Sequence, residues 1–427
     1  MVGHRPSGVP PILRWAFLAF VFSLNFELGK DKTIPIEPPT LCAGLFLLVA
    51  LLRPRFTFQR PPLAFWWFAA HVGLFTLSFL LHGVVHEEVF YYRLFYLVFL
   101  HSLALPAYQL MRYEGLAKEA LVTLILSSLV VSVLMLTGIF KTIMPDRRVT
   151  FLNQNPAFLA CILAIAMVAL IGWVSGPEKP PRVWRYLAWP GFAILGLAVI
   201  ATGTRGAVLA LGVGLFAFLF RPGGYGVKLR SVGLLVFLAG TLLLLGYRST
   251  IMVDRVEDSV EGGDLAKREV IYPTSLHMIL EDPLLGWGPV QNDYEIELRV
   301  QYPNKEYLEA HNLFLEVLTG TGILGGLPFF VGLWLCFQAA WKARRGTHSI
   351  TPLAMLVTAL VSSMGMPWLY SKTFWLVIAY TLARRNPWEE PGAGRILPAV
   401  GSWRERGLVW NQSRPVQAIE TNCSRSR

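Results

Sequence analysis

Apolar residues run along this chain in long blocks that short polar segments separate. A block of about 20 apolar residues has the length of a helix that crosses the hydrocarbon core of a bilayer. The pattern therefore predicts an all-α polytopic membrane protein with about 12 transmembrane helices. The predicted spans cover residues 12–28, 38–52, 63–82, 89–110, 116–140, 156–175, 185–202, 205–220, 230–248, 310–340, 350–367 and 373–384.

One polar stretch, residues 249–304, is much longer than the other connections. A long loop in a tight bundle is usually either functional or disordered, and the many apolar residues of this one favour a packed structure. We expect a helix that Asp264 caps, that runs toward Leu280 and that Pro273 bends. The Pro- and Gly-containing segment 283–288 then predicts a turn with an apolar anchor.

The chain is predicted to have four parts. These are nine spans in residues 1–248, a large and partly helical loop in 249–309, three spans in 310–384 and a basic tail in 385–427. Lys and Arg gather in alternate short loops, and such loops stay in the cytoplasm. The charge pattern therefore predicts that both termini are cytoplasmic and that the large loop faces outward. The loop charges are Arg53, Arg55, Arg60, Arg112, Lys118, Lys179, Arg182, Arg185, Arg221, Lys228, Arg230, Lys342, Arg344 and Arg345.

Composition narrows the class of protein further. Hydrophobic residues make up 54% of the 427 residues and charged residues 15%. A soluble domain carries about 25% charged residues. These values exclude a cytosolic enzyme, a nucleic-acid-binding protein and an all-β barrel. The formal net charge of +11 is then interpreted as the charge of Lys and Arg in the loops. These residues set the topology and interact with anionic lipid headgroups.

Several well-known catalytic motifs do not occur in the sequence. It has no P-loop, no His-Glu-x-x-His, no Gly-x-Ser-x-Gly and no Asp-x-Asp pair. Glu295 and Glu297 imitate the last of these, but as neighbours in a polar loop they are more simply interpreted as solvated carboxylates. The four cysteines form no CxxC pair and no Cys/His cluster, which supports neither a disulfide framework nor a thiolate metal site. We expect neither a metal nor a cofactor.

Arg205 is the first candidate for chemistry, because it lies between two apolar spans with almost no loop. It is either an orientation anchor or a ligand-binding residue. Topology does not favour positive charge on the outward side, which argues against a simple anchor. Its neighbours Gly203 and Gly206 would let a bulky ligand approach the backbone closely.

Other arginines are predicted on the same side of the membrane. Arg147 and Arg148 lie in another outward loop, and Arg268 lies in the predicted loop helix. Guanidinium groups suit a phosphate or diphosphate, because their fork of donors matches its oxygens. These three residues and Arg205 are therefore predicted to bind a diphosphate.

His311 is the candidate base. It lies where the large loop enters the tenth predicted span. Histidine titrates near neutrality, and a helix N-terminus disfavours its charged form, which leaves it available to take a proton from a hydroxyl. The alternative is a histidine that only hydrogen-bonds at a helix start. His82, His86, His101 and His277 are weaker candidates, and His101, on an apolar span, is expected to be a packing residue.

Five motifs together resemble those of the O-antigen ligase family, whose superfamily also contains O-antigen polymerases and protein O-oligosaccharyltransferases. Thr204-Arg205-Gly206 opens a span, and the long loop contains Arg268 and the sequence Pro-Leu-Leu-Gly-Trp-Gly at 283–288. His-Asn-Leu-Phe-Leu at 311–315 and Gly-Thr-Gly-Ile-Leu-Gly at 320–325 follow. The motifs cover roughly residues 200–330, and the span pattern is compatible over the whole chain.

The resemblance implies a glycosyltransferase of the bacterial inner membrane, with a fold like that of type C glycosyltransferases. Such ligases work on the periplasmic face and move polysaccharide from undecaprenyl diphosphate to a sugar hydroxyl of lipid A–core, by a metal-independent inverting mechanism. The essential arginines of the family fall on Arg205 and Arg268, and its essential histidine falls on His311. Asn312 is expected to support the site. Arg147 and Arg148 are added from loop position alone.

Chemistry at these residues agrees with the implied reaction. A diphosphate leaving group needs neutralisation of the charge that grows as the glycosidic bond breaks, which Arg205 and Arg268 can supply. The acceptor hydroxyl needs a base on the opposite face of the anomeric carbon, and His311 can serve. The alternatives are an O-antigen polymerase, a protein O-oligosaccharyltransferase and, more distantly, a flippase for lipid-linked sugars, for which neither paired intramembrane charges nor repeat halves are evident.

Overall fold

The computed structural model describes residues 8–28, 37–82, 87–176, 180–261, 263, 265–300, 308–345 and 350–385. All of these belong to one compact unit, and the statements below refer to them. The predicted basic tail lies outside the described residues except for Arg385, as do His86 and Asp264.

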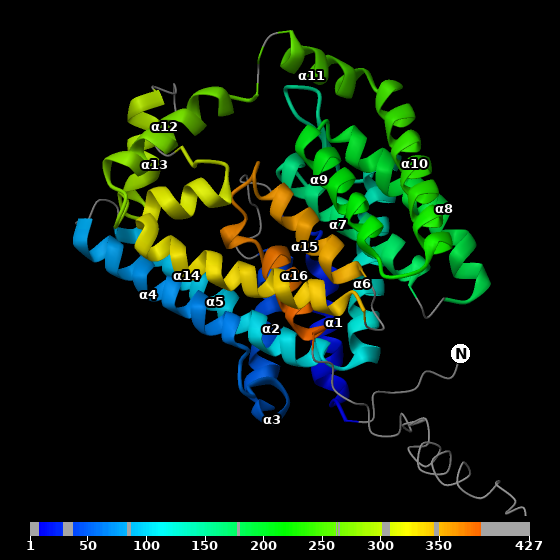
Figure 1. Ribbon diagram of the computed structural model, residues 1–427, viewed down its shortest axis with the longest axis horizontal. Helices are drawn as coiled ribbons and strands as arrows, with labels where there is room; N and C mark the ends of the chain where they lie inside the picture. Colours follow the sequence, from blue (N-terminus) through cyan, green and yellow to red (C-terminus); the bar gives the residue numbers. More distant parts are fainter. Residues whose placement is uncertain are drawn as a thin grey trace, which may run out of the picture. The chain divides into compact units, whose positions relative to one another are not determined.

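Apolar helices occupy each of the twelve predicted spans (Figure 1). Seven are long and apolar enough to cross a membrane. They are α4 (Leu63–His82), α5 (Glu87–Met111), α6 (Glu114–Thr137), α7 (Pro156–Ser175), α8 (Arg182–Ala201), α10 (Tyr225–Tyr247) and α14 (Leu313–Ala343). The shorter apolar helices are α1 (Pro11–Ser23), α2 (Pro38–Leu51), α9 (Arg205–Phe216, continued by η1, Ala217–Phe220), α15 (Thr351–Ser362) and α16 (Lys372–Ala383). The protein is thus mostly helical and of the membrane type, and the number of twelve spans stays a prediction.

The spans pack around α7, whose residues from Leu159 to Gly172 are all buried. This helix contacts α6, α8, α9 and α15, while α14 lies along α4 and α16 lies along α5. At the other extreme, α10 buries only Leu238 and Leu242 and exposes apolar side chains along most of its length. Such a surface matches the lipid phase better than water. Short elements α3 (Pro54–Thr57) and η2 (Trp368–Tyr370) complete the bundle.

A small β-hairpin follows α6 and was not predicted, although the chain as described is of the all-α class. Strands β1 (Lys141–Ile143) and β2 (Val149–Phe151) pair antiparallel, with Lys141 opposite Phe151. Arg147, with φ of 64°, lies in its turn. Three-residue strands in a loop leave too little alternation of apolar and polar positions for the sequence to reveal them.

Three helices fold from the long polar loop: α11 (Thr250–Val260), α12 (Arg268–Glu281) and α13 (Gln291–Val300). Pro273 lies inside α12. The predicted cap at Asp264 is wrong, because α12 begins at Arg268 and its N-cap is Lys267, whose side chain makes no capping hydrogen bond. A backbone of φ 67° at Lys267 turns the chain into the helix without an acidic cap.

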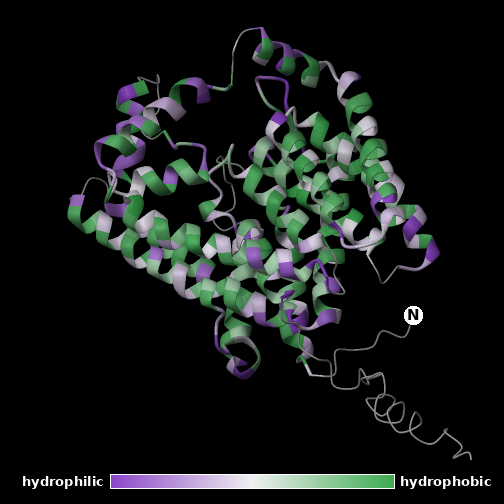
Figure 2. Ribbon diagram, viewed as in Figure 1, coloured by the Kyte–Doolittle hydropathy of each residue, from purple (hydrophilic) through white to green (hydrophobic). Residues whose placement is uncertain are grey.

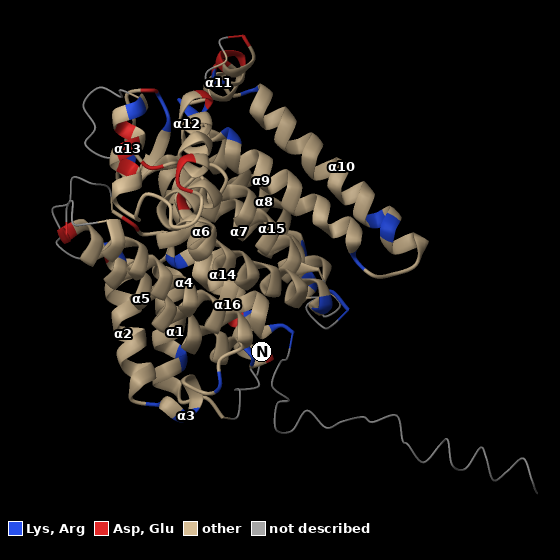
Figure 3. Ribbon diagram, turned by 60° about the vertical axis from the view of Figure 1, so that its left-hand side comes forward, with Lys and Arg blue, Asp and Glu red and all other residues tan. Residues whose placement is uncertain are grey.

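Charge and polarity differ between the two ends of this unit. The loop helices α11, α12 and α13 carry more hydrophilic residues than the bundle helices (Figure 2). Acidic side chains gather at this end, whereas Lys and Arg mark the opposite end around α3 (Figure 3).

Candidate functional site

The turn between α8 and α9 brings Arg205 to the first position of α9, after the N-cap Thr204. Gly203 has φ of 62°, and a β-carbon there would lie 2.9 Å from Ile251 Cγ2 and 3.2 Å from Arg148 Cγ. Side chains of the protein thus fill the space beside Gly203. The prediction that this glycine lets a ligand approach the backbone is therefore wrong, because the hairpin and α11 occupy the position.

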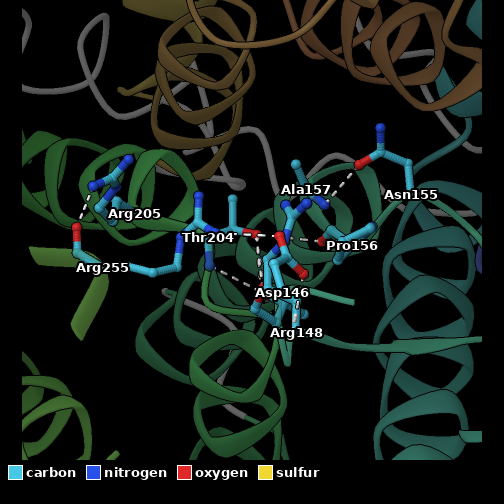
Figure 4. A network of polar contacts seen from close by, with 9 residues as sticks. Asp146, Arg148, Asn155, Pro156, Ala157, Thr204, Arg205 and Arg255 are labelled. Carbon is cyan, nitrogen blue, oxygen red and sulfur yellow. Dashed lines mark hydrogen bonds and ion pairs between the residues drawn. The ribbon is translucent and has the colours of Figure 1, made fainter. Parts of the chain in front are cut away.

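Arginines from two elements pair with one carboxylate at this turn, and a third arginine, Arg205, contacts one of them (Figure 4). Arg148 Nε lies 2.6 Å from Asp146 Oδ2, and Arg255 Nη1, on α11, lies 3.4 Å from the same oxygen. The Arg205 guanidinium donates to the main-chain oxygen of Arg255. We call Arg148, Arg205 and Arg255 the arginine cluster. Three guanidinium groups with one carboxylate leave a net positive charge, which is suited to an anion.

The arginine cluster contains two of the predicted residues and one further arginine. Arg148 and Arg205, far apart in sequence, lie close together, and Arg255 had not been predicted. The one signal in the sequence that could have identified Arg255 was its position in an amphipathic helix of the large loop. The hydrogen bonds that join the cluster do not involve Arg147, which is exposed in the hairpin turn.

An apolar groove of about 900 Å³ begins at the arginine cluster. It runs between α9, α10 and α11, and Arg205 and Glu257 are the charged residues on its wall. Its apolar wall includes Ile200, Val208, Leu209, Val213, Phe216, Leu242, Leu243, Met252 and Val256. The groove combines a long apolar surface with the guanidinium of Arg205, beside which lies the carboxylate of Glu257.

A second polar group forms where α12, α14 and the segment after α15 meet. Arg268 Nη2 donates to Gly365 O at 2.7 Å. The Tyr272 hydroxyl donates to Met364 O and, at 3.4 Å, to His311 O. We call Arg268, Tyr272, His311 and Asn312 the histidine group. Burial raises the pKa of the Tyr272 hydroxyl, and the Arg268 guanidinium opposes this rise.

Asn312 fixes the start of α14 next to His311. Its Oδ1 accepts from Phe314 N at 3.0 Å and from Leu315 N at 3.4 Å, so that it is the N-cap. His311 directly precedes this cap with φ of 49°, a conformation that is uncommon for a residue with a side chain. A backbone conformation of this kind is strained, and such strain concentrates at functional sites.

Residues next to the arginine cluster and near the histidine group both contact the first turn of α7. Thr204 Oγ1 lies 3.5 Å from Pro156 O, which opens α7. Phe158 stacks on Trp368, three residues after Gly365, with ring centroids 5.7 Å apart. The four predicted residues Arg148, Arg205, Arg268 and His311 are thus distributed over two groups that share one helix end.

The other histidines are placed differently. His82 Nδ1 hydrogen-bonds Ser78 O at 2.8 Å, and His277, which is exposed, lies 2.8 Å from Glu281. His101 packs against Trp375 with ring centroids 4.2 Å apart.

The turn at 283–288 interlocks with the kink of α14. Trp287 N donates to Thr319 O at 2.7 Å, and Ile323 N donates to Pro283 O at 2.8 Å. Gly286 has φ of 67°, and a β-carbon there would lie 2.6 Å from Gly322 N. This contact connects two glycine-rich motifs of the sequence and fixes the loop helices to α14, the helix that follows His311.

Replacing Gly286 with alanine should therefore destabilise the protein by about 3 kcal/mol or more, because overpacking and a left-handed backbone add their costs. Thermal inactivation in detergent would show the loss as a lower midpoint temperature. Gly240→Ala, on α10, is the control, since nothing lies within 4 Å of the added carbon. An unchanged midpoint for Gly286→Ala would contradict the close packing of these motifs.

The fold and these groups define a polytopic membrane protein in which loop helices complete a cationic site at one end of the bundle. Comparison with known proteins specifies the class further. Residues 190–330 match the family model of the O-antigen ligase. Over 173 residues the chain is 31% identical to the O-antigen ligase of Pseudomonas aeruginosa. The match covers 40% of this chain and 39% of the relative, or about two fifths of each. Over this part of its length the chain is thus similar to the O-antigen ligase family.

Proposed function

We propose that this protein is an O-antigen ligase of the bacterial inner membrane, active in lipopolysaccharide biosynthesis. In this proposal it transfers polysaccharide from undecaprenyl diphosphate to a sugar hydroxyl of lipid A–core. The observation that carries the proposal is the arginine cluster at one end of an apolar groove, within the segment that matches the family.

The distribution of charge supports a periplasmic site. The end that carries α11–α13 is rich in acidic and hydrophilic side chains, while Lys and Arg mark the opposite end. Because basic loops remain in the cytoplasm, the loop helices belong to the periplasmic side and both termini to the cytoplasmic side.

The donor would lie with its isoprenoid chain in the groove and its diphosphate at the arginine cluster. A chain of isoprene units is long and apolar, and the groove offers a long apolar wall. Arg205 and Arg148 neutralise the diphosphate, Arg147 lies next to them in the hairpin turn, and Arg268 acts from the histidine group, where it donates to Gly365 O. Guanidinium groups bind phosphate oxygens in pairs, which also orients the bond to be broken.

The reaction then needs one base and no covalent intermediate. His311 takes the proton as the acceptor O–H bond breaks, and the acceptor oxygen forms its bond to the anomeric carbon. The bond from that carbon to the phosphate oxygen breaks on the opposite face, and its electron pair leaves with the diphosphate. Attack in line with the leaving group inverts the anomeric configuration. Arg205 and Arg268 stabilise the charge that grows on the leaving group.

A transfer assay in detergent tests this proposal against its alternatives. The purified protein, given O-antigen on undecaprenyl diphosphate and separate lipid A–core, should produce lipid A–core that carries the polysaccharide. Longer chains on the carrier would indicate a polymerase instead. Transfer to Ser or Thr of an added protein would indicate an oligosaccharyltransferase. No transfer by folded protein, where no membrane gradient exists, would favour a flippase.

A further inference from the structure

A buried ion pair that the proposed reaction does not use lies at the start of α13. Arg93, on α5, donates through Nη1 to Pro289 O at 2.7 Å and through Nη2 to Asp293 Oδ2 at 2.5 Å. Asp293 is completely buried, and its other oxygen, Oδ1, has no hydrogen-bond partner among the described residues. One carboxylate oxygen is thus held by the guanidinium while the other is not satisfied.

Glu316, in the first turn of α14, is a second acid, and its charge acts on this ion pair. Its side chain is 5% exposed, and neither carboxyl oxygen has a hydrogen-bond partner within the described part of the chain. It lines a cavity of about 10 Å³ together with His71, Asn292 and Tyr370. A cavity of this size accommodates about one water molecule. Asn292 Oδ1 and His71 Nε2 also lack a protein partner among the described residues, so the cavity is polar on several sides.

Acidic side chains outnumber basic side chains around this ion pair. Arg93 supplies one positive charge, whereas Asp293, Glu316 and Glu309 supply up to three negative charges. Burying an unpaired carboxylate is costly, so the surplus must be met by a proton or by a nearby cation. Burial raises the pKa of the Asp293 carboxyl to about 6; the Arg93 guanidinium opposes this rise and Glu309 adds to it. Protonation of this group is therefore accessible near neutral pH.

Main-chain hydrogen bonds connect both acidic residues to the chain segment that contains His311. Asp293 O accepts from Leu308 N at 3.3 Å, which holds α13 against the residues just before His311. Glu316 N donates to Asn312 O at 2.8 Å, in the first turn after the cap. The charges of Asp293 and His311 act on each other. An imidazolium at His311 would be the cation that the surplus negative charge requires.

Other titratable groups face the same region from neighbouring elements. Tyr370, from η2, lies beside Arg93, and His71, from α4, closes the cavity. Arg268 and Tyr272 face His311 from α12. Of these groups only Arg268 carries a charge near neutral pH with certainty, and it is positive.

We propose that Asp293, which is paired with Arg93, and the neighbouring buried acid Glu316 form a proton-sharing pair that sets the basicity of His311. This inference rests on the proposed function. The pair carries one proton while the imidazole is neutral. When His311 accepts the hydroxyl proton, the pair releases its own proton to water at the periplasmic face, and its negative charge then stabilises the imidazolium. Asp293 and Glu316 are positioning residues, since they act through His311.

The pH dependence of transfer tests this inference. As the pH is lowered, His311 becomes protonated, and the rate of transfer by the wild-type protein should fall. Asp293→Asn and Glu316→Gln keep the size of each side chain and remove its charge, so the imidazolium loses stabilisation. We expect the acid limb of kcat/KM to move to lower pH by about half a unit or more. The value of kcat should fall about tenfold, while KM for either substrate changes little.

Glu295→Gln is the matched control, because Glu295 lies on the same helix and pairs with Arg299 away from the cavity. It should keep the wild-type profile. Glu316→Asp retains the charge and should restore the acid limb. If the Asp293→Asn variant does not accumulate in the membrane, the pH profile of the Glu316→Gln variant alone tests the inference. An acid limb that stays at the wild-type pH in folded Glu316→Gln would overturn the inference.

The His311→Ala variant separates this inference from the proposed function. If that variant transfers sugar at the wild-type rate, the assignment of the base is wrong and the inference fails with it. If His311→Ala is inactive while Glu316→Gln and Asp293→Asn keep the wild-type profile, the proposed function stands and only the proton-sharing pair is rejected.

Discussion

Replacing His311 with alanine is expected to lower the rate of polysaccharide transfer by about 10²–10⁴-fold, the contribution of a positioned general base. The variant loses the imidazole that takes the acceptor proton, but Asn312 still caps α14. Alanine also has a smaller side chain than histidine, so that no particular rotamer is needed at a backbone φ of 49°. The amount of protein in the membrane should therefore be close to wild type. The measurement is initial rate in detergent, together with the ratio of capped to bare lipid A–core in cells.

His277→Ala is the matched control for this experiment. His277 lies on α12, is exposed, and pairs with Glu281 rather than with the histidine group. Its removal should leave the transfer rate within about twofold of wild type, as most surface substitutions do. Full activity of His311→Ala would remove the proposed base, and an equal loss in both variants would point to a general defect of the loop helices.

Arg205→Ala is expected to reduce kcat by about 10²–10³-fold, comparable to the loss of one donor that stabilises a developing anion. Arg205 lies on the wall of the groove, and its guanidinium meets Arg255 at the arginine cluster. Lysine at this position keeps the charge but loses the planar fork, so Arg205→Lys should recover only part of the rate. The assay is the same transfer reaction, with the concentration of the lipid-linked donor varied to separate kcat from KM.

Arg248→Ala serves as the control for charge alone. Arg248 is exposed at the end of α10, one residue before the cap of α11, and it takes no part in the arginine cluster. Its loss should change the rate by less than about twofold. Wild-type kinetics in Arg205→Ala would refute the placement of the diphosphate at this turn.

The sequence allowed the helices to be predicted because their apolar blocks are long and uninterrupted. Each predicted span coincides with an apolar helix, and even the loop helix around Pro273 was anticipated. Reasoning from apolar periodicity did not predict the short elements. The hairpin at Lys141–Phe151 has no periodicity to detect, and the start of α12 at Arg268 depends on a left-handed Lys267 that no motif signals.

The candidate site could be predicted only in part, because its residues meet through tertiary contacts. Arg205 and His311 stand out through their motifs. Arg255 and Tyr272 do not, since an arginine on an amphipathic helix and a tyrosine near the membrane are ordinary features. Asp293 is a similar case, because burial and the approach of Arg93 give it significance, and neither can be read from the chain around it.

The interlock of Gly286 with Gly322 has a consequence for how the protein is made. Folding during synthesis proceeds from the N-terminus. The loop helices therefore leave the ribosome before α14 does, and the turn at 283–288 has no surface to close on until the kink at Gly322 has been inserted into the bilayer. A nascent chain that stops short of Gly322 already contains Arg148, Arg205, Arg255 and Arg268, but the site around them is not assembled. Catalytic competence is therefore a late event of membrane insertion.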